Sequence, residues 1–174
     1  GSHTVKLENV FIPDAAVVLR RPRGAYHPVW NVVLTVAMPL IMSVYVGIAQ
    51  KAAQLTIGHV RQKKTANPHV SYLIGEMNND LVAAEIQLND MLRIANNYDF
   101  EAIDQNGHDI LTRKTNVANA AIRVVTKAME IAGGEGFYRG FGLERLFRDV
   151  QGARYHPLPE SDQVKFSGDY LLRD

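Results

Sequence analysis

A stripe of apolar residues between Asn67 and Asn97 constrains the fold more than any other feature of the sequence. Its members lie alternately four and three positions apart: Val70, Ile74, Met77, Leu81, Ala84, Leu88, Met91 and Ala95. This spacing places all of them on one face of an α-helix, as in the helices of a bundle. Asn67 before Pro68 is a helix start signal, and Asn96-Asn97 indicates its end. The sequence therefore predicts one long amphipathic helix that packs against other helices.

A second stripe of the same kind follows a polar segment that ends in an Asn106-Gly107 turn. It consists of Ile110, Lys114, Val117, Ala121, Val124, Ala128 and Ile131, and Gly133-Gly134 closes the helix. Lys114 is the one charged member. Its stem either extends along the bundle edge with its ammonium in water, or its ammonium pairs with a buried carboxylate.

Two further helical regions complete the predicted architecture. A short helical segment is expected over residues 28–37, and Pro39 fits the first turn of a long helix that continues to about Lys64. A last helix is expected from Ser161 to Leu172, with Ser161 or Asp162 as its N-cap. Helices joined by short loops predict an all-α antiparallel four-helix bundle.

The N-terminal residues have a different pattern. Val5, Leu7, Val10 and Ile12 approximately alternate with polar residues, which predicts one β-strand preceding the bundle. A single strand needs sheet partners, so we expect residues 4–25 to be the end of a β-domain and a linker. Residues 1–3 resemble a purification-tag remnant, and residues 26–174 form the expected bundle domain.

Composition excludes several classes of function. The formal net charge of +1 provides no basic face for nucleic acid, and the absence of cysteine excludes disulfides and thiolate chemistry. The six histidines are scattered, so we expect no metal site. Asn31, Pro39 and Ser43 interrupt the most apolar run, so we expect no membrane span and a cytoplasmic protein.

Four segments in order resemble the acyl-CoA dehydrogenase family, whose C-terminal domain is a helical bundle. The most specific is Gly-Gly-Glu-Gly-Phe at 133–137, followed by Leu-Glu-Arg-Leu-Phe-Arg-Asp at 143–149. Residues 46–52 resemble a turn of the family's first bundle helix, and residues 71–77 resemble the start of its second. Residues 7–13 resemble the last strand of its middle β-domain.

The resemblance implies FAD as the cofactor and implies further domains that this chain lacks. It places Gly133 and Gly134 against the FAD pyrophosphate, and glycines do allow phosphate to approach the backbone. Glu130 takes the place of a cofactor-binding glutamine, and Arg61 that of an arginine that contacts flavin. The implied protein is a homodimer or homotetramer with an acyl-CoA or related small molecule as substrate.

The catalytic base is where the sequence departs from the family. Pro157 occupies the position of the family's catalytic glutamate, and Ala37 occupies the alternative position. Glu160 could substitute as the base. His156 instead matches a histidine with which related flavin-dependent monooxygenases assist their chemistry, since an imidazole can act as acid or base near neutral pH.

Three functions therefore stay open from the sequence. The first is an acyl-CoA dehydrogenase-type oxidoreductase that acts on a CH–CH group with an atypical base. The second is a monooxygenase that uses His156, and the third is a bundle that serves only structure or oligomerisation. In each case we expect this fragment alone to be inactive and to bind FAD weakly.

Overall fold

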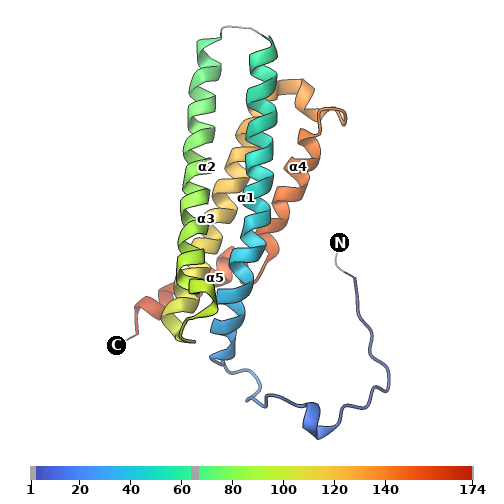
Figure 1. Ribbon diagram of the computed structural model, residues 1–174, viewed down its shortest axis with the longest axis vertical. Helices are drawn as coiled ribbons and strands as arrows, with labels where there is room; N and C mark the ends of the chain where they lie inside the picture. The colour runs from blue at the N-terminus through green and yellow to red at the C-terminus, as the bar shows by residue number, and fades with distance from the viewer. Residues whose placement is uncertain (1–2, 64–66, 174) are drawn as a thin grey trace.

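The structure is a computed structural model that describes residues 3–63 and 67–173, and it is a helical bundle with an N-terminal arm (Figure 1). Residues 1 and 2 of the expected tag remnant, and Lys64, lie outside the described residues. The α-helices are α1 (Val29–Lys63), α2 (Pro68–Ala95), α3 (Asp104–Ala132), α4 (Leu143–Val150) and α5 (Glu160–Leu171). Short 3₁₀ turns lie at Asp14–Ala16, Asn96–Tyr98, Gly133–Phe137 and Gln151–Tyr155.

Helix α3 lies at the centre of the bundle. It contacts α1, α2, α4 and α5 and has buried side chains along its whole length. Helices α1, α2 and α3 run alongside one another, α4 lies beside α1 and α3, and α5 lies at the end of the bundle near Val29 (Figure 1). The all-α bundle expected from the apolar stripes is confirmed.

The predicted ends of α2 are also confirmed. The side chain of Asn67 accepts a hydrogen bond of 3.0 Å from the backbone N–H of His69, which satisfies one of the unpaired donors at the helix start. Asn96 and Asn97 both have left-handed backbone conformations, which end the helix.

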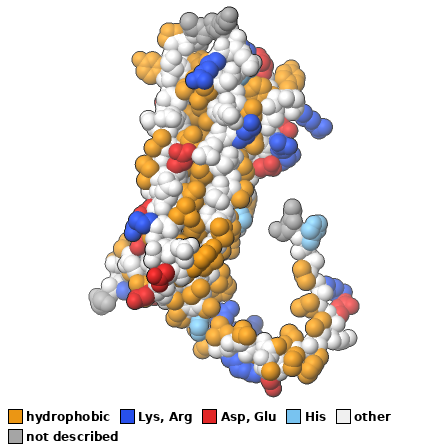
Figure 2. Space-filling model, in the orientation of Figure 1, with side chains coloured by type: hydrophobic (Ala, Val, Ile, Leu, Met, Phe, Trp, Pro, Cys, Tyr) orange, Lys and Arg blue, Asp and Glu red, His pale blue; other side chains and the backbone are white. Residues whose placement is uncertain are grey.

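The predicted N-terminal strand is wrong for this structure. None of the described residues forms a strand, and Val5, Leu7 and Phe11 are exposed on an extended arm. Figure 2 shows hydrophobic side chains along this arm, which has no second strand with which to pair.

Three helix boundaries also differ from the prediction. α1 is a single helix that includes Pro39, so no break separates residues 28–37 from the rest. Asn106 and Gly107 lie inside α3 and form no turn. α5 begins at Glu160, and its N-cap is Pro159, which makes no side-chain capping bond. Packing against the bundle outweighs the local turn and break signals at these sites.

α1 is long and apolar enough to cross a membrane by length and composition. The core helix of a soluble protein passes the same test. In this structure Met42, Ala49 and Ala52 of α1 are fully buried within the bundle. The expected absence of a membrane span stays a prediction.

A buried polar contact explains the glycine inside α3. Asn31 is fully buried, its Nδ2 donates to Asp104 Oδ1 at 3.0 Å, and its Oδ1 accepts from the Tyr26 hydroxyl. A Cβ atom at Gly107 would overlap with this Oδ1. Glycine at 107 therefore allows α1 and α3 to share a satisfied polar contact in the core.

We expect Gly107→Ala to lower the free energy of unfolding by about 1–3 kcal/mol, because the new methyl group displaces Asn31 from its partners. Gly75→Ala in α2 is the matched control, since no atom lies within 4 Å of its added Cβ. That substitution should stabilise the helix by about 0.5–1 kcal/mol. Urea unfolding of both variants tests the difference, and equal stabilisation of the two would contradict it.

Candidate functional site

His156 lies in the chain segment between the 3₁₀ turn that follows α4 and the start of α5. This segment crosses α1, so that His156 Nε2 and the Tyr45 hydroxyl share a hydrogen bond of 2.6 Å. The two rings also pack at a tilt, with their centroids 5.4 Å apart. The imidazole is partly buried and held by a partner 111 positions earlier in the sequence.

Lys114 of α3 binds the same segment two residues after His156. Only 1% of its surface is exposed, and its Nζ donates a hydrogen bond of 2.8 Å to the backbone carbonyl of Leu158. Neither alternative from the sequence is therefore right: the ammonium does not reach water, and its hydrogen-bond partner is a carbonyl. A charge-assisted hydrogen bond partly offsets the cost of burying this cation.

The charges around His156 favour its neutral form. Burial lowers the pKa of the imidazole below its usual value, and the nearby positive charge of Lys114 lowers it further. Burial also lowers the pKa of Lys114, an effect that the charge of Glu160 opposes. Burial raises the pKa of the Tyr45 hydroxyl, so that it keeps its proton at neutral pH.

The other candidate positions for a base differ from His156 in their surroundings. Glu160 is exposed and accepts a hydrogen bond of 2.9 Å from Asn119 Nδ2. Pro157 lines an apolar cleft of about 300 Å³. The other residues that line the cleft are Tyr26, Trp30, Val33, Leu34, Met38, Leu111, Leu158 and Phe166. His156 is thus the residue directly before Pro157, which lines the cleft. Pro157 itself has no titratable group.

The glycine turn lies at the C-terminal end of α3 (Figure 1), whereas His156 hydrogen-bonds to Tyr45 near the middle of α1. Gly133 has φ 60° and ψ −148°, a conformation that favours glycine. Gly133 and Gly134 are exposed, and a Cβ at either would meet no atom within 4 Å. Gly136 is instead buried, with Met129 and Ala132 against it. The first two glycines therefore offer an open backbone, whereas the third serves packing.

Two basic side chains of α1 face this turn. Lys63 forms an ion pair with Glu135, and His59 Nε2 lies 3.3 Å from the same carboxylate. His59 Nε2 is buried and makes no hydrogen bond to any residue that the structure describes. The Lys63 ammonium holds the pKa of Glu135 below its usual value. The turn thus combines an open backbone, a carboxylate paired with Lys63 and a buried imidazole nitrogen without a hydrogen bond, which fits the phosphate groups of a dinucleotide.

Arg61 and Glu130 do not belong to this cluster. Arg61 lies two positions from both His59 and Lys63, about 200° around the helix, and is exposed on another face of α1. Glu130 pairs with Lys127 at 2.9 Å, and Lys127 also pairs with Glu76 of α2. Cofactor contacts by Arg61 and Glu130 stay predictions. The sequence reasoning overlooked His59, although its spacing of four from Lys63 could have revealed it.

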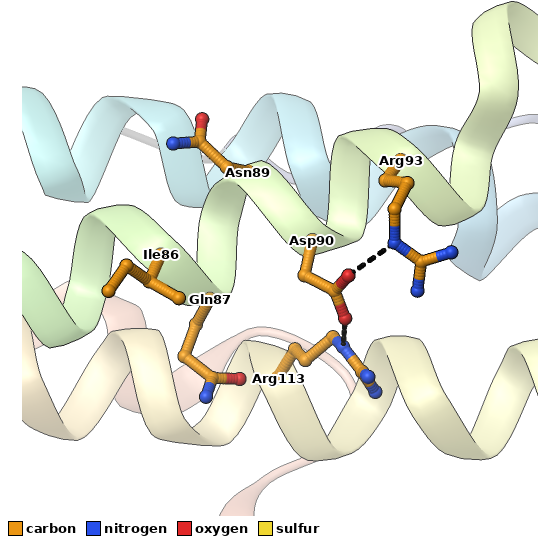
Figure 3. A pocket seen from close by; sticks show the side chains of 6 residues that line it. All are labelled: Ile86, Gln87, Asn89, Asp90, Arg93 and Arg113. Atoms are coloured by element: carbon orange, nitrogen blue, oxygen red, sulfur yellow. Dashed lines mark hydrogen bonds and ion pairs between the residues drawn. The ribbon is translucent and has the colours of Figure 1, made fainter.

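A shallow hollow on α2 and α3 is lined in part by side chains that bind one another. Its side chains are Ile86, Gln87, Asn89, Asp90, Arg93 and Arg113 (Figure 3). Asp90 accepts hydrogen bonds from Arg93 at 2.6 Å and from Arg113 of α3. Both carboxylate oxygens of Asp90 are therefore hydrogen-bonded, and Asp90 cross-links α2 to α3. Across residues 3–63 and 67–173, no three His, Asp or Glu side chains are grouped to hold a metal ion.

Comparisons with known proteins establish the family. The family described as "Acyl-CoA dehydrogenase, C-terminal domain" matches residues 28–156. The chain is 30% identical over 177 residues to YdbM of Bacillus subtilis, whose name assigns it to the acyl-CoA dehydrogenases. That match covers 94% of this chain and 43% of YdbM. The chain therefore belongs to the acyl-CoA dehydrogenase family.

Two of the other matches are named as nitrososynthases. The amino sugar nitrososynthase DnmZ of Streptomyces peucetius is 27% identical, over 79% of this chain and 36% of DnmZ. The nitrososynthase structure from Micromonospora carbonacea has a TM-score of 0.79 at 23% identity, covering 88% of this chain and 41% of its own. KijD3, solved in complex with FMN, has a TM-score of 0.75 at 24% identity, covering 88% and 40%. The chain thus spans less than half the length of these proteins.

We expect the Asp90 cross-link to make stability depend on pH. Hydrogen bonds from Arg93 and Arg113 hold the pKa of Asp90 below its usual value. Its contribution is thus present above the unfolded-state pKa of about 4 and is lost as pH falls through the folded-state pKa. Asp90→Asn should cost on the order of 1 kcal/mol at pH 7, given its partial exposure, and less at lower pH. Urea unfolding of both proteins from pH 7 to pH 3 measures this, and a difference that grows on acidification would contradict it.

Proposed function

We propose that this chain is the C-terminal bundle of a flavin-dependent monooxygenase built on the acyl-CoA dehydrogenase fold, with His156 at the reacting atoms. One observation carries the proposal. The segment has proline at 157, where the family has its glutamate, and the neighbouring His156 is held by a 2.6 Å hydrogen bond to Tyr45. An imidazole kept neutral near pH 7 can hold or accept a proton at a reacting oxygen, which proline cannot do.

The relatives support this choice over a plain dehydrogenase. The family is flavin-dependent, and neighbours of the fold were solved with FMN or FAD. DnmZ and the Micromonospora protein are named as nitrososynthases, and another neighbour is the HsaA monooxygenase. Reduced flavin supplies the two electrons with which one atom of O₂ enters the substrate and the other leaves as water.

The residues of this chain divide that work between the glycine turn and the segment that carries His156. The backbone at Gly133 and Gly134 would hold the pyrophosphate of FAD, with His59 and Lys63 behind it. His156 would hold a proton at the reacting oxygen, and the apolar cleft beside Pro157 would exclude water and hold an apolar part of the substrate. We further propose that the full-length protein is a homodimer or homotetramer and adds its own N-terminal and β domains.

A second candidate is an acyl-CoA dehydrogenase that uses Glu160 as its base. The 30% identity to YdbM favours it, and Glu160 is a carboxylate three residues after Pro157. Glu160 is exposed and hydrogen-bonded to Asn119, so it is a weaker base than a buried carboxylate. It is therefore less suited to removing a weakly acidic proton.

We expect Gly134→Val to weaken flavin binding by the full-length protein at least tenfold, because a branched side chain would keep the pyrophosphate away from the backbone. Gly140→Val is the matched control, since Gly140 is also exposed with no atom within 4 Å of an added Cβ. Fluorescence titration with FAD and with FMN measures both variants. Equal affinities would show that the glycine turn does not hold the cofactor.

We expect His156→Ala to lower oxygenation by roughly 10² to 10⁴-fold while flavin binding is kept. The assay uses the full-length protein, a flavin reductase and isotopically labelled O₂, with dTDP-amino sugars and phenols as probes. Incorporated oxygen is measured by mass spectrometry, and Glu160→Gln should retain activity.

The same proteins test the alternatives. Bleaching of the bound flavin by butyryl- or octanoyl-CoA under argon, abolished by Glu160→Gln, would replace the monooxygenase with the dehydrogenase. A full-length protein that binds neither FAD nor FMN would leave only a structural role for the bundle.

A further inference from the structure

The hydroxyl of Tyr45 occupies a space that only glycine leaves open. A Cβ atom at Gly152 would lie 2.8 Å from Tyr45 Oη and 3.6 Å from two atoms of its ring. Gly152 belongs to the 3₁₀ turn Gln151–Tyr155, four residues before His156. The turn that directly precedes His156 therefore also provides the site at which the Tyr45 hydroxyl lies.

The direction of the Tyr45–His156 hydrogen bond determines which ring nitrogen carries the proton. A neutral imidazole has one N–H donor and one acceptor nitrogen. The separation of 2.6 Å fits an O–H donor and is shorter than the roughly 2.7–3.2 Å of an N–H donor, so the Tyr45 hydroxyl is placed to donate its proton. If Nε2 accepts that proton in a hydrogen bond, the imidazole N–H must be on Nδ1.

The groups around the ring favour this neutral arrangement. Lys114 of α3 is buried and cationic, and its charge disfavours an imidazolium. Glu160 at the start of α5 lies near enough to act on Lys114, and it also accepts a bond from Asn119. From α1, Tyr45 is the partner that hydrogen-bonds to the ring.

We propose that Tyr45, placed by Gly152, is a positioning residue that donates to Nε2 and fixes His156 as the Nδ1–H tautomer. His156 then presents a hydrogen-bond donor to the substrate and acts on an oxygen that gains negative charge. A neutral histidine can polarise a carbonyl or stabilise such an oxygen in this way. The role toward substrate rests on the proposed function, whereas the tautomer is a property of this chain alone.

The tautomer can be measured without flavin or substrate. In long-range ¹H–¹⁵N spectra of the ¹⁵N-labelled chain, above the pKa of His156, Nδ1 should appear protonated and Nε2 unprotonated. Tyr45→Phe should shift the ring toward the Nε2–H form and raise the pKa of His156, because the bond to the neutral form is lost. Gly152→Ala should do the same with the hydroxyl still present, since the tip of Tyr45 must move. Tyr72→Phe, on an exposed tyrosine of α2, should change neither.

Activity of the full-length protein then tests the donor role. Tyr45→Phe should lower kcat roughly tenfold, the size of one hydrogen bond, with little change in KM. His156→Asn places an amide N–H near the position of Nδ1 and should retain more activity than His156→Gln, which places it near Nε2.

An unprotonated Nδ1 in the unmodified chain would overturn the inference, as would a tautomer unaffected by both Tyr45→Phe and Gly152→Ala. Full activity of every His156 variant, with the tautomer as expected, would instead refute the proposed function and leave the tautomer assignment intact. The two failures are therefore distinguishable.

Discussion

The burial of α3 is the constraint on which the rest of the structure depends. Buried residues occur along it from Gly107 to Ala132, and α1, α2, α4 and α5 all pack against it. Burying each large apolar side chain contributes roughly 1.5–3 kcal/mol before entropy is subtracted. Because the glycine turn follows α3 and Lys114 of α3 binds the segment that carries His156, α3 also fixes the distance between the two.

Two buried polar side chains of the core are hydrogen-bonded within the bundle. Asn31 bonds to Tyr26 and Asp104 across α1 and α3, and Lys114 bonds to the carbonyl of Leu158. Each would be costly to bury without its partner, so each contact fixes the relative position of two segments. The second contact matters for chemistry, because it holds the chain two residues beyond His156. Core and site are thus stabilised by the same lysine.

Regular patterns in the sequence predicted most of the fold. The apolar stripes of α2 and α3 and the cap at Asn67 were sufficient for the all-α bundle, because burial periodicity and capping are local signals. Pro39 and Asn106-Gly107 were misleading, because packing in the core overrides a local break or turn signal. The strand over residues 5–12 could not form, since pairing depends on strands that the described chain does not provide.

The site was predictable only in part. His156 and the glycines of the turn stood out by their types and spacing, yet Tyr45 and Gly152 did not. Tyr45 is 111 positions from His156, and a glycine in a 3₁₀ turn gives no sign of what it faces. Contacts between distant segments depend on how helices pack, which a single sequence does not specify.

The hydrogen bond from Lys114 also restricts the motion of the segment around Leu158. If the segment around Leu158 lifted from the bundle, a cation with 1% exposure would lose its hydrogen-bond partner while still surrounded by apolar side chains. Such an opening is costly unless α3 loosens too, so this segment and the middle of α3 open as one cooperative unit. His156 thereby shares the rigidity of the core, although it lies in a connection between two helices.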